Sequence, residues 1–242
     1  MRKFVINAVM KQKDIEEIEP LWDLNEIWSS LTYSERLAIQ PFMKIVQYKK
    51  NEVIYRKGDK PDGVLTLVKG KVRIYIEGLG GKQQIIRLLK PYDFFGYRSA
   101  IAHDTHTTCA SAFEDCTFYR VETEEFLHLV GKNNEFCHKL LVDIAMDLAT
   151  SDMRQVSLTQ KHLRGRLAEA IEALEEHYGL EEDGITLAFR ISREDLANMS
   201  NMTTANAIRT LSQFVQEGVI ATENKRIQIL NKPELKKISR MG

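Results

Sequence analysis

The hydrophobic periodicity of the chain changes near Glu122, and this change predicts a fold with two different kinds of structure. Before this residue, short apolar runs alternate with turn residues, a pattern typical of antiparallel strands. The clearest run, residues 71–77, places Val72, Ile74 and Ile76 on one predicted face. Further predicted strands cover residues 52–55, 64–68, 84–89, 109–113 and 117–121. Many short strands at this spacing predict a sandwich or barrel.

After that residue, the stretch to about residue 160 contains no proline and predicts a long helix. Four apolar residues in this helix recur at spacings of four, three and four, namely Cys137, Leu141, Ile144 and Leu148. This heptad-like pattern favours dimerisation through the helix. The alternative interpretation is a helix that packs only on its own domain.

The last part of the chain predicts a helix over residues 163–177, a strand over residues 186–191 and then two short helices. Ser192 and Asp195 have the spacing of an N-terminal capping box, so the first short helix starts there. Asn201 favours a tight turn with positive φ, because asparagine tolerates this conformation better than most residues. Thr203 can then cap the second short helix.

The second short helix has two distinct faces. Its apolar face consists of Ala207, Leu211, Phe214 and Val215. Since successive residues are about 100° apart around a helix, the opposite face consists of Ala205, Arg209, Ser212 and Gln216. Gly218 ends the helix, and residues 219–222 and 226–230 predict a hairpin with Lys225 near its tip. A small polar outer face with one positive charge suits the major groove of DNA. The alternative is a small helical subdomain.

Charge and cysteine content limit the classes of function. The 242 residues contain 34 Lys+Arg and 34 Asp+Glu, so any DNA contact must be local. Residues 185–242 hold nine basic and five acidic residues, a local excess of four positive charges. Cys109, Cys116 and Cys137 form neither a CxxC pair nor an even set, which argues against a disulfide framework or a cysteine-rich zinc site.

Neither a membrane segment nor a catalytic motif is expected. Asn7 interrupts the apolar stretch of residues 4–10, so we expect no secretory signal, no membrane partner and a cytoplasmic location. The chain has no P-loop, GxSxG or HExxH motif, so we expect no enzyme. The glycine-rich residues 78–81 lie between two predicted strands and are interpreted as a hairpin tip rather than a phosphate-binding loop.

These motifs together resemble the cyclic-AMP-receptor/fumarate-nitrate-regulator (Crp/Fnr) family. The C-terminal resemblance is carried by Ser192-Arg193-Glu194-Asp195-Leu196-Ala197, residues 203–211 and Glu217-Gly218-Val219-Ile220. The N-terminal resemblance is carried by Asn51-Glu52-Val53-Ile54-Tyr55, Gly58-Asp59, Val68-Lys69-Gly70-Lys71-Val72 and Asp93-Phe94-Phe95-Gly96. The resemblance extends over about residues 25–235 in the order typical of the family.

The resemblance implies an α+β protein in three parts. These are N-terminal helices with a cyclic-nucleotide-binding-like β-roll (jelly roll) over residues 1–125, a long dimerisation helix and hinge over residues 126–160, and a winged helix-turn-helix over residues 161–242. It also implies a homodimeric, sequence-specific transcription regulator whose partners are a double-stranded DNA operator and RNA polymerase. The competing interpretation is a ligand-binding regulatory module that acts through protein–protein contacts.

The expected effector pocket departs from that of family members that bind cyclic AMP. Its residues are Gly96, Tyr97, Arg98, Ser99, His106, Thr107 and Thr108. Those relatives have a glutamate after the Phe-Gly pair and an Arg-Ser pair about a dozen residues later, whereas this chain has Tyr97 at the first position. The later pair is His106-Thr107 or Thr107-Thr108, so the usual cation for a cyclic phosphate is missing. We therefore expect no tight binding of cyclic AMP.

The resemblance implies two other possible cofactors, an iron–sulfur cluster and haem. The iron–sulfur branch uses four cysteines, most of them near the N-terminus, whereas the first cysteine here is Cys109, so we expect no cluster. Haem needs only one or two axial ligands, and its candidates are His103, His106, His128, His138 and Cys109. Haem therefore stays an alternative that residue spacing does not support, and the effector is not identified by the sequence.

The expected DNA-binding residues fall into two groups. Ser192, Arg193, Thr203 and Lys225 are placed for phosphates, and Thr204, Ala205, Arg209 and Ser212 are placed for bases. Well-known relatives carry Arg and Glu where this chain has Thr204 and Ala205. Arg209 is therefore the one strong base-reading side chain, and the operator is expected to differ from the best-known half-site of the family.

Overall fold

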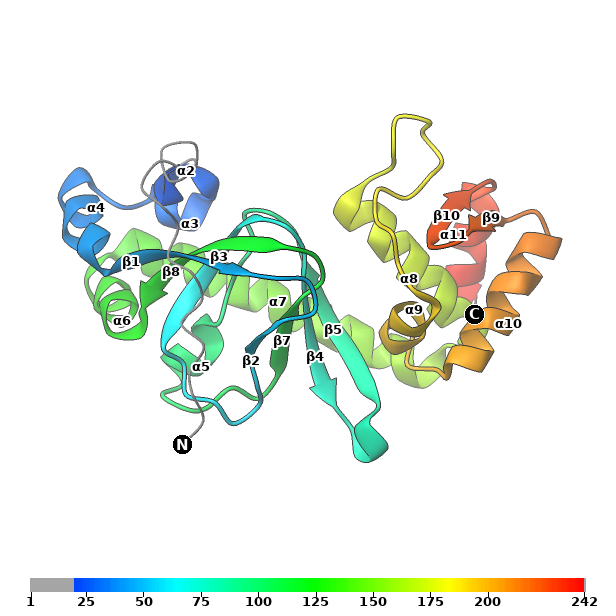
Figure 1. Ribbon diagram of the computed structural model, residues 1–242, viewed down its shortest axis with the longest axis horizontal. Helices are drawn as coiled ribbons and strands as arrows, with labels where there is room; N and C mark the ends of the chain where they lie inside the picture. The colour runs from blue at the N-terminus through cyan, green and yellow to red at the C-terminus, as the bar shows by residue number, and fades with distance from the viewer. Residues whose placement is uncertain (1–19, 242) are drawn as a thin grey trace. The chain divides into compact units, whose positions relative to one another are not determined.

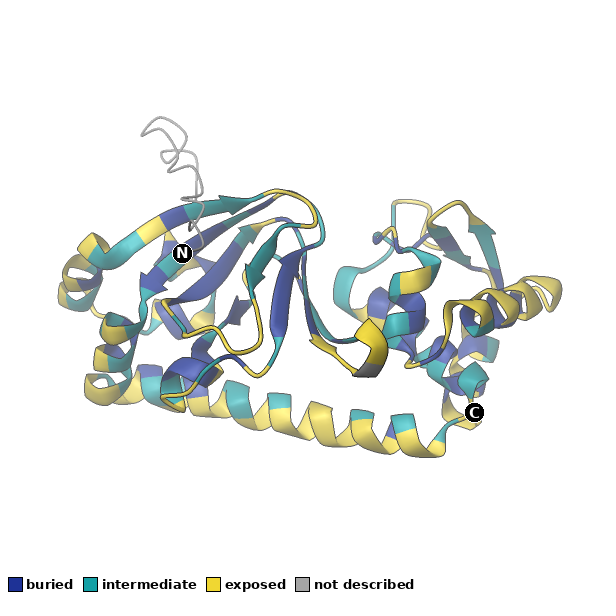
Figure 2. Ribbon diagram, turned by 60° about the horizontal axis from the view of Figure 1, so that its bottom comes forward, coloured by how far each residue is buried: buried dark blue, intermediate teal, exposed yellow. Residues whose placement is uncertain are grey.

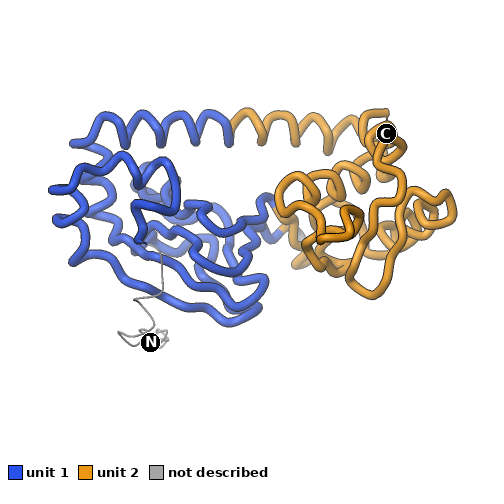
Figure 3. Tube along the Cα trace, turned by 90° about the horizontal axis from the view of Figure 1, so that it is seen from above, with its two compact units in different colours: residues 1–77, 86–147 blue, residues 78–85, 148–242 orange. Residues whose placement is uncertain are grey.

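The computed structural model describes residues 20–241 (Figure 1), so the apolar residues 4–10, where no secretory signal is expected, lie outside the described residues. The chain divides into two compact units (Figure 3). The first contains residues up to 77 together with 86–147, and the second contains residues 78–85 together with 148–242.

Two four-stranded sheets form the β-roll of the first unit. Their strand orders are β1-β8-β3-β6 and β2-β7-β4-β5. The strands are β1 (Met43–Tyr48), β2 (Val53–Tyr55), β3 (Gly63–Lys69), β4 (Val72–Glu77), β5 (Gln83–Leu89), β6 (Phe94–Phe95), β7 (Cys109–Ala112) and β8 (Cys116–Glu122). All six strands expected from the sequence are present, whereas β1 and the two-residue β6 were not expected.

In β4, the predicted alternation of buried and exposed residues is present in only part of the strand. Val72 and Ile74 are buried as expected, but Ile76 is 36% exposed and Tyr75 is only 3% exposed. The pairing of β4 with β7 ends at Tyr75, which lies opposite Cys109. Ile76 lies beyond this pairing, and the predicted alternation of inward and outward side chains therefore stops there.

Short helices at the start of the described chain cover one hydrophobic cluster of the first unit. They are α2 (Leu21–Leu24), α3 (Glu26–Ser29) and α4 (Tyr33–Ile39). Trp28 is fully buried, and its indole Nε1 donates a 2.8 Å hydrogen bond to Oγ1 of Thr66 on β3. Its ring lies 5.4 Å from that of Phe94 and 5.3 Å from that of Phe136. Trp28 thus connects these helices to the sheet and to the helix that carries Phe136.

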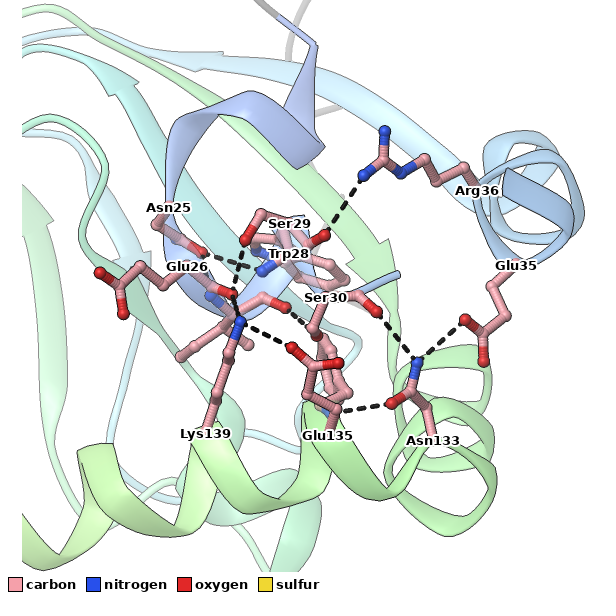
Figure 4. A network of polar contacts seen from close by, with 12 residues as sticks. Asn25, Glu26, Trp28, Ser29, Ser30, Glu35, Arg36, Asn133, Glu135 and Lys139 are labelled. Carbon is pink, nitrogen blue, oxygen red and sulfur yellow. Dashed lines mark hydrogen bonds and ion pairs between the residues drawn. The ribbon is translucent and has the colours of Figure 1, made fainter. Parts of the chain in front are cut away.

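The helix expected from residue 122 onward is divided into α6 (Thr123–Lys132) and α7 (Asn134–Gln160). The break falls at Asn133, whose extended backbone (φ −102°, ψ 104°) cannot continue a helix. Its Oδ1 accepts from Phe136 N at 2.9 Å, and its Nδ2 donates to Ser30 O and to Glu35 (Figure 4). The sequence prediction of one continuous helix is wrong here, because contacts to a distant segment favour the break.

The second unit contains the expected helices and hairpin. Its elements after α7 are α8 (Leu163–Tyr178), α9 (Arg193–Met199), α10 (Thr204–Gln216), β9 (Ile220–Glu223), β10 (Arg226–Ile229) and α11 (Lys232–Met241). The strand expected over residues 186–191 is present only as isolated bridges. Leu187 N donates to Ile227 O, but Ala188 N donates to Gly179 O, so the segment does not keep one partner. None of the helices within residues 20–241 combines the length and the hydrophobicity that crossing a bilayer requires.

Candidate DNA-binding face and effector pocket

The first helix of the helix-turn-helix starts with half of the expected capping box. Ser192 Oγ accepts from Asp195 N at 3.0 Å, as predicted. The Asp195 carboxylate, however, accepts from the Ser192 hydroxyl rather than from its backbone N–H. At α4, Thr32 and Glu35 form both halves of the box. Aspartate is one methylene shorter than glutamate, which explains why the reciprocal bond is missing at Ser192.

The turn between the two helices has the predicted geometry. Asn201 adopts a positive φ of 48°, and Met202, which follows it, is buried. Thr203 Oγ1 accepts from Asn206 N at 3.2 Å and thereby caps α10. These local interactions fix the start of the helix that the sequence assigns to the DNA groove.

One residue of α10 that was predicted to be buried is exposed, and one exposed residue was not predicted. Ala207, Leu211 and Phe214 are buried as expected, but Val215 is 42% exposed and Thr210 is buried in its place. The exposed face contains Thr204, Ala205, Ile208, Arg209, Ser212 and Gln216. Ile208 is 48% exposed and adds an apolar group next to Arg209. The sequence could have indicated the exposure of Ile208, because this residue falls between the two predicted faces of the helix.

An arginine of α8 fixes the far end of α10. Both terminal nitrogens of Arg164 bind the carboxylate of Glu217, and its guanidinium carbon lies 4.9 Å from the centre of the Phe214 ring. The bond from Arg164 holds the pKa of Glu217 below its usual range. The helix is therefore anchored at both ends, which holds its outward face in a defined orientation.

The basic side chains near this face differ in their partners. Arg209 and Lys225 are exposed, and neither side chain pairs with a carboxylate within residues 20–241. Arg193 is partly buried, and its Nη1 has no hydrogen-bond acceptor within that range either. Arg226, by contrast, is paired with Glu181. Ser192 and Thr203 use their hydroxyls for the helix caps described above.

All seven residues expected at the effector pocket line one cavity in the β-roll. They are Gly96, Tyr97, Arg98, Ser99, His106, Thr107 and Thr108. Five further residues complete the lining, namely Tyr55, Ile74, Ile86, Arg87 and Phe95. Arg87 was not predicted at the pocket, although a single charge within the apolar run of residues 85–89 is a usable signal.

An aromatic stack forms one wall of this cavity. The rings of Tyr55 and His106 lie parallel, with their centres 3.8 Å apart. Burial lowers the pKa of His106, while the charges of Asp59 and Asp62 oppose this effect. The imidazole is therefore neutral at pH 7. No group of three or more His, Cys, Asp or Glu side chains suited to a metal ion is found in the described part of the chain.

A charged cluster forms the other wall. Arg87 Nη1 lies 2.6 Å from Asp147 Oδ2, and Arg98 Nη2 lies 2.8 Å from the same atom. The Tyr97 hydroxyl donates to this oxygen at 2.9 Å and to Asp143 Oδ2 at 3.0 Å. Burial and the two carboxylates raise the pKa of Tyr97, so its hydroxyl stays protonated. Both aspartates belong to α7, so this cluster connects the pocket to the long helix.

The four residues expected at a dimer interface lie in different environments on α7. Leu141 and Leu148 are 58% and 62% exposed. Ile144 is partly buried and packs against the hydrophobic cluster of the first unit, and Cys137 is also partly buried. A second set of residues is exposed along the helix (Figure 2), namely Val142, Met146, Ala149, Met153 and Val156.

Comparison with known proteins supports both the β-roll and the helix-turn-helix. The cyclic nucleotide-binding domain family model matches residues 45–133, and the Crp-like helix-turn-helix domain family model matches residues 165–238. A β-roll of this type followed by a winged helix-turn-helix defines a class of DNA-binding transcription regulators.

Individual relatives point to the same group. The cyclic AMP receptor protein of Thermus thermophilus is 26% identical over 184 residues, which cover 76% of this chain and 82% of that protein. The transcriptional activator protein FnrL of Cereibacter sphaeroides is 27% identical over 201 residues, which cover 80% of this chain and 79% of that protein. The structure of FixK2 from Bradyrhizobium japonicum has a TM-score of 0.73 at 23% identity and covers 81% of this chain and 96% of that one. The chain belongs to the Crp/Fnr family of transcription regulators.

Proposed function

We propose that this chain is a homodimeric regulator that acts in the cytoplasm, binds a two-fold symmetric operator and senses an effector other than cyclic AMP. The observation that carries the proposal is the exposed face of α10, on which Arg209 has no carboxylate partner within residues 20–241. A cation in this state is available to the acceptor groups of a guanine in the major groove. The function is regulatory and not enzymatic, and contact with RNA polymerase follows from the family.

The exposed residues of α10 are suited to different chemical groups of the DNA. Arg209 can bind O6 and N7 of guanine, and the apolar side chain of Ile208 can contact the methyl group of thymine. Thr204 can contact a base edge or a methyl group, while Ala205 and Ser212 are small enough to allow a close approach. Contacts to phosphate come from Arg193, Thr203 and Lys225, and they position the helix without reading sequence. Ser192, which the sequence also assigns to phosphate, already donates its hydroxyl proton to Asp195 and has no second side-chain donor for a phosphate.

The exposed stripe of α7 supports dimerisation. Val142, Met146, Ala149, Met153 and Val156 are exposed and follow one another at spacings of four, three, four and three. This is the heptad spacing of a two-stranded coiled coil. Leu141 and Leu148 border this stripe, whereas Ile144 contacts its own β-roll. We therefore propose an interface centred on Met146 and Met153, which lies slightly around the helix from the one expected from the sequence.

The relative named cyclic AMP receptor protein suggests cyclic AMP as an effector, but the pocket residues here do not fit it. Tyr97 occupies the position of the ribose-binding glutamate, and its hydroxyl is bound to Asp143 and Asp147. The later Arg-Ser position holds no arginine, and His106 is held against Tyr55. Calorimetry is expected to show no binding of cyclic AMP at micromolar concentration.

The proposal is tested with the full chain and a DNA sequence selected from a random pool. We expect a selected site with two inverted half-sites about one helical turn apart. Affinity should fall steeply when salt is raised from about 50 mM to about 200 mM. Sedimentation should give a dimer, and Met146→Lys should give a monomer that no longer binds the site. A monomeric wild-type chain, or one that selects no sequence at low salt, would favour the protein-binding alternative.

A further inference from the structure

We propose that the β-roll pocket binds a small organic anion on Arg87 and Arg98, and that this anion replaces the carboxylate of Asp147. Binding would then release a tie between the pocket and α7. The inference names the ligand class of the effector pocket and therefore rests on the proposed function.

The hydrogen bonds of the cluster converge on a single atom. Oδ2 of Asp147 is within 2.6 Å of Arg87, 2.8 Å of Arg98 and 2.9 Å of the Tyr97 hydroxyl. A carboxylate oxygen offers about two lone-pair directions, so three donors exceed what this atom can accept in good geometry. A ligand carboxylate or phosphate brings two or three oxygens to the same donors and can bind each arginine in a fork geometry.

Both arginines are accessible from the cavity. They belong to its lining, and the side chain of Arg98 is 51% exposed while that of Arg87 is 27% exposed. The cluster of two arginines with Asp143 and Asp147 carries formal charges that sum to zero. An anion that entered without displacing a carboxylate would add a negative charge beside two others. Exchange with Asp147 keeps each arginine paired, so exchange is the favoured route.

The rest of the pocket indicates what the anion carries. One side is apolar and aromatic, formed by Tyr55, Ile74, Ile86 and Phe95. Ser99, Thr107 and Thr108 add hydroxyl groups, and the neutral ring of His106 adds no cation. The wall therefore suits a compact body with one or two hydrogen-bonding groups. Small carboxylates and phosphates fit this chemistry better than a nucleotide, whose ribose partner and phosphate partner are both missing.

The exchange takes place on α7, the helix that also carries the proposed dimer interface. Asp147 is adjacent in sequence to Met146 and Leu148, which are exposed on α7. Removal of the arginine contacts from Asp147 changes how this turn of α7 is held by the roll. Because a ligand shifts a conformational equilibrium only through different affinities for the two states, the Asp147 contact is the feature by which the anion would distinguish them.

The test compares four full-length proteins, namely wild type, Asp147→Asn, Arg98→Gln and Asp152→Asn. Asp152 is an exposed aspartate on the same helix and serves as the matched control. Each protein is titrated by calorimetry with succinate, inorganic phosphate and cyclic AMP at constant ionic strength. We expect succinate or phosphate to bind Asp147→Asn about tenfold more tightly than wild type, because the internal competitor has been weakened. Arg98→Gln should bind the same probe about tenfold more weakly, and Asp152→Asn should match wild type.

The probe that binds more tightly identifies the chemical class of the ligand. Preference for succinate identifies a carboxylate ligand, and preference for phosphate identifies a phosphate ligand. Equal affinities for Asp147→Asn and Asp152→Asn, no saturation of any variant at tens of millimolar, or saturation by cyclic AMP alone would each contradict the exchange.

Operator binding measured on the same samples separates this inference from the proposed function. Anion exchange without any DNA binding would contradict only the regulator, and DNA binding without the exchange would contradict only the ligand assignment.

Discussion

The arginines of the β-roll pocket and the arginine on the outer face of α10 differ in whether the protein supplies a carboxylate partner. In the β-roll, Arg87 and Arg98 both bind the carboxylate of Asp147, which belongs to the same unit. On α10, Arg209 is exposed and pairs with no carboxylate within residues 20–241. One pair of cations is thus neutralised by the protein itself, while the other cation is left to an external partner.

This difference indicates how each surface meets an anion. A phosphate or a guanine can approach Arg209 without displacing a protein group, so the contact adds directly to affinity. An anion at the pocket must first separate a carboxylate from two arginines, and breaking an ion pair that is partly shielded from water is costly. On the proposed function, DNA would meet α10 without this cost, whereas a ligand of the pocket would have to offer better contacts than Asp147.

The largest expected effect concerns the cation without an internal partner. Arg209→Met should lower affinity for the selected operator by about tenfold to hundredfold, which corresponds to about 1–3 kcal/mol, and should relax specificity at one base pair. Fluorescence anisotropy with labelled DNA at fixed salt measures this loss. Arg240→Met removes an exposed charge from α11 and should change affinity by less than about twofold. Equal losses for the two variants would mean that Arg209 supplies only general charge.

The next effect concerns the two paired arginines. It is expected in the stability of the protein instead of in its affinity for DNA. Arg87→Met should lower the free energy of unfolding by about 1–2 kcal/mol, because Asp147 loses one partner but keeps Arg98 and Tyr97. Arg209→Met should change this quantity by less than about 0.5 kcal/mol. Urea unfolding followed by circular dichroism measures both. If Arg87→Met were as harmless as Arg209→Met, the contrast between the two arginine sites would not hold.

A smaller effect is expected from the aromatic wall of the pocket. Burial lowers the pKa of His106, so the folded state resists protonation more than the unfolded chain does. Stability should therefore be complete above the unfolded pKa of about 6.5 and should fall as the pH decreases from there toward the folded pKa. His106→Phe keeps an aromatic ring against Tyr55 and should remove this part of the pH dependence. Urea midpoints between about pH 8 and pH 5 test it, and identical slopes for both proteins would contradict the assignment.

The smallest effect concerns the cap of α9. Asp195→Glu lengthens the side chain by one methylene and should complete the box that Thr32 and Glu35 already form at α4. We expect about 0.5 kcal/mol of added stability for the second unit, with operator affinity unchanged within about twofold. Thermal unfolding measures the gain. A loss of stability would show that the hydroxyl–carboxylate contact of Ser192 is the better arrangement.

Local signals in the sequence predicted much of the fold. The alternation of short apolar runs located six of the eight strands of the β-roll, and the cap at Thr203 with the turn at Asn201 located α10. These features depend on residues within a few positions of one another. Resemblance to a family added the seven pocket residues, which line one cavity.

The features that were missed depend on contacts between distant residues. Arg87 and Asp147 are 60 positions apart, and no short pattern connects them. The break at Asn133 depends on Ser30 and Glu35, which the periodicity of a helix does not register. Val215 was predicted to be buried because the apolar pattern does not mark Thr210, a polar residue that is buried on the other side of the stripe.

The position of Trp28 provides an intrinsic optical reporter. The chain contains two tryptophans, and both lie in the N-terminal helical segment, Trp22 in α2 and Trp28 in α3. Trp28 is fully shielded from water and contacts Phe136 in the first turns of α7. Separation of α7 from the roll would admit water to this indole and shift its emission to longer wavelength. Movements of the long helix can thus be followed in the unlabelled native protein.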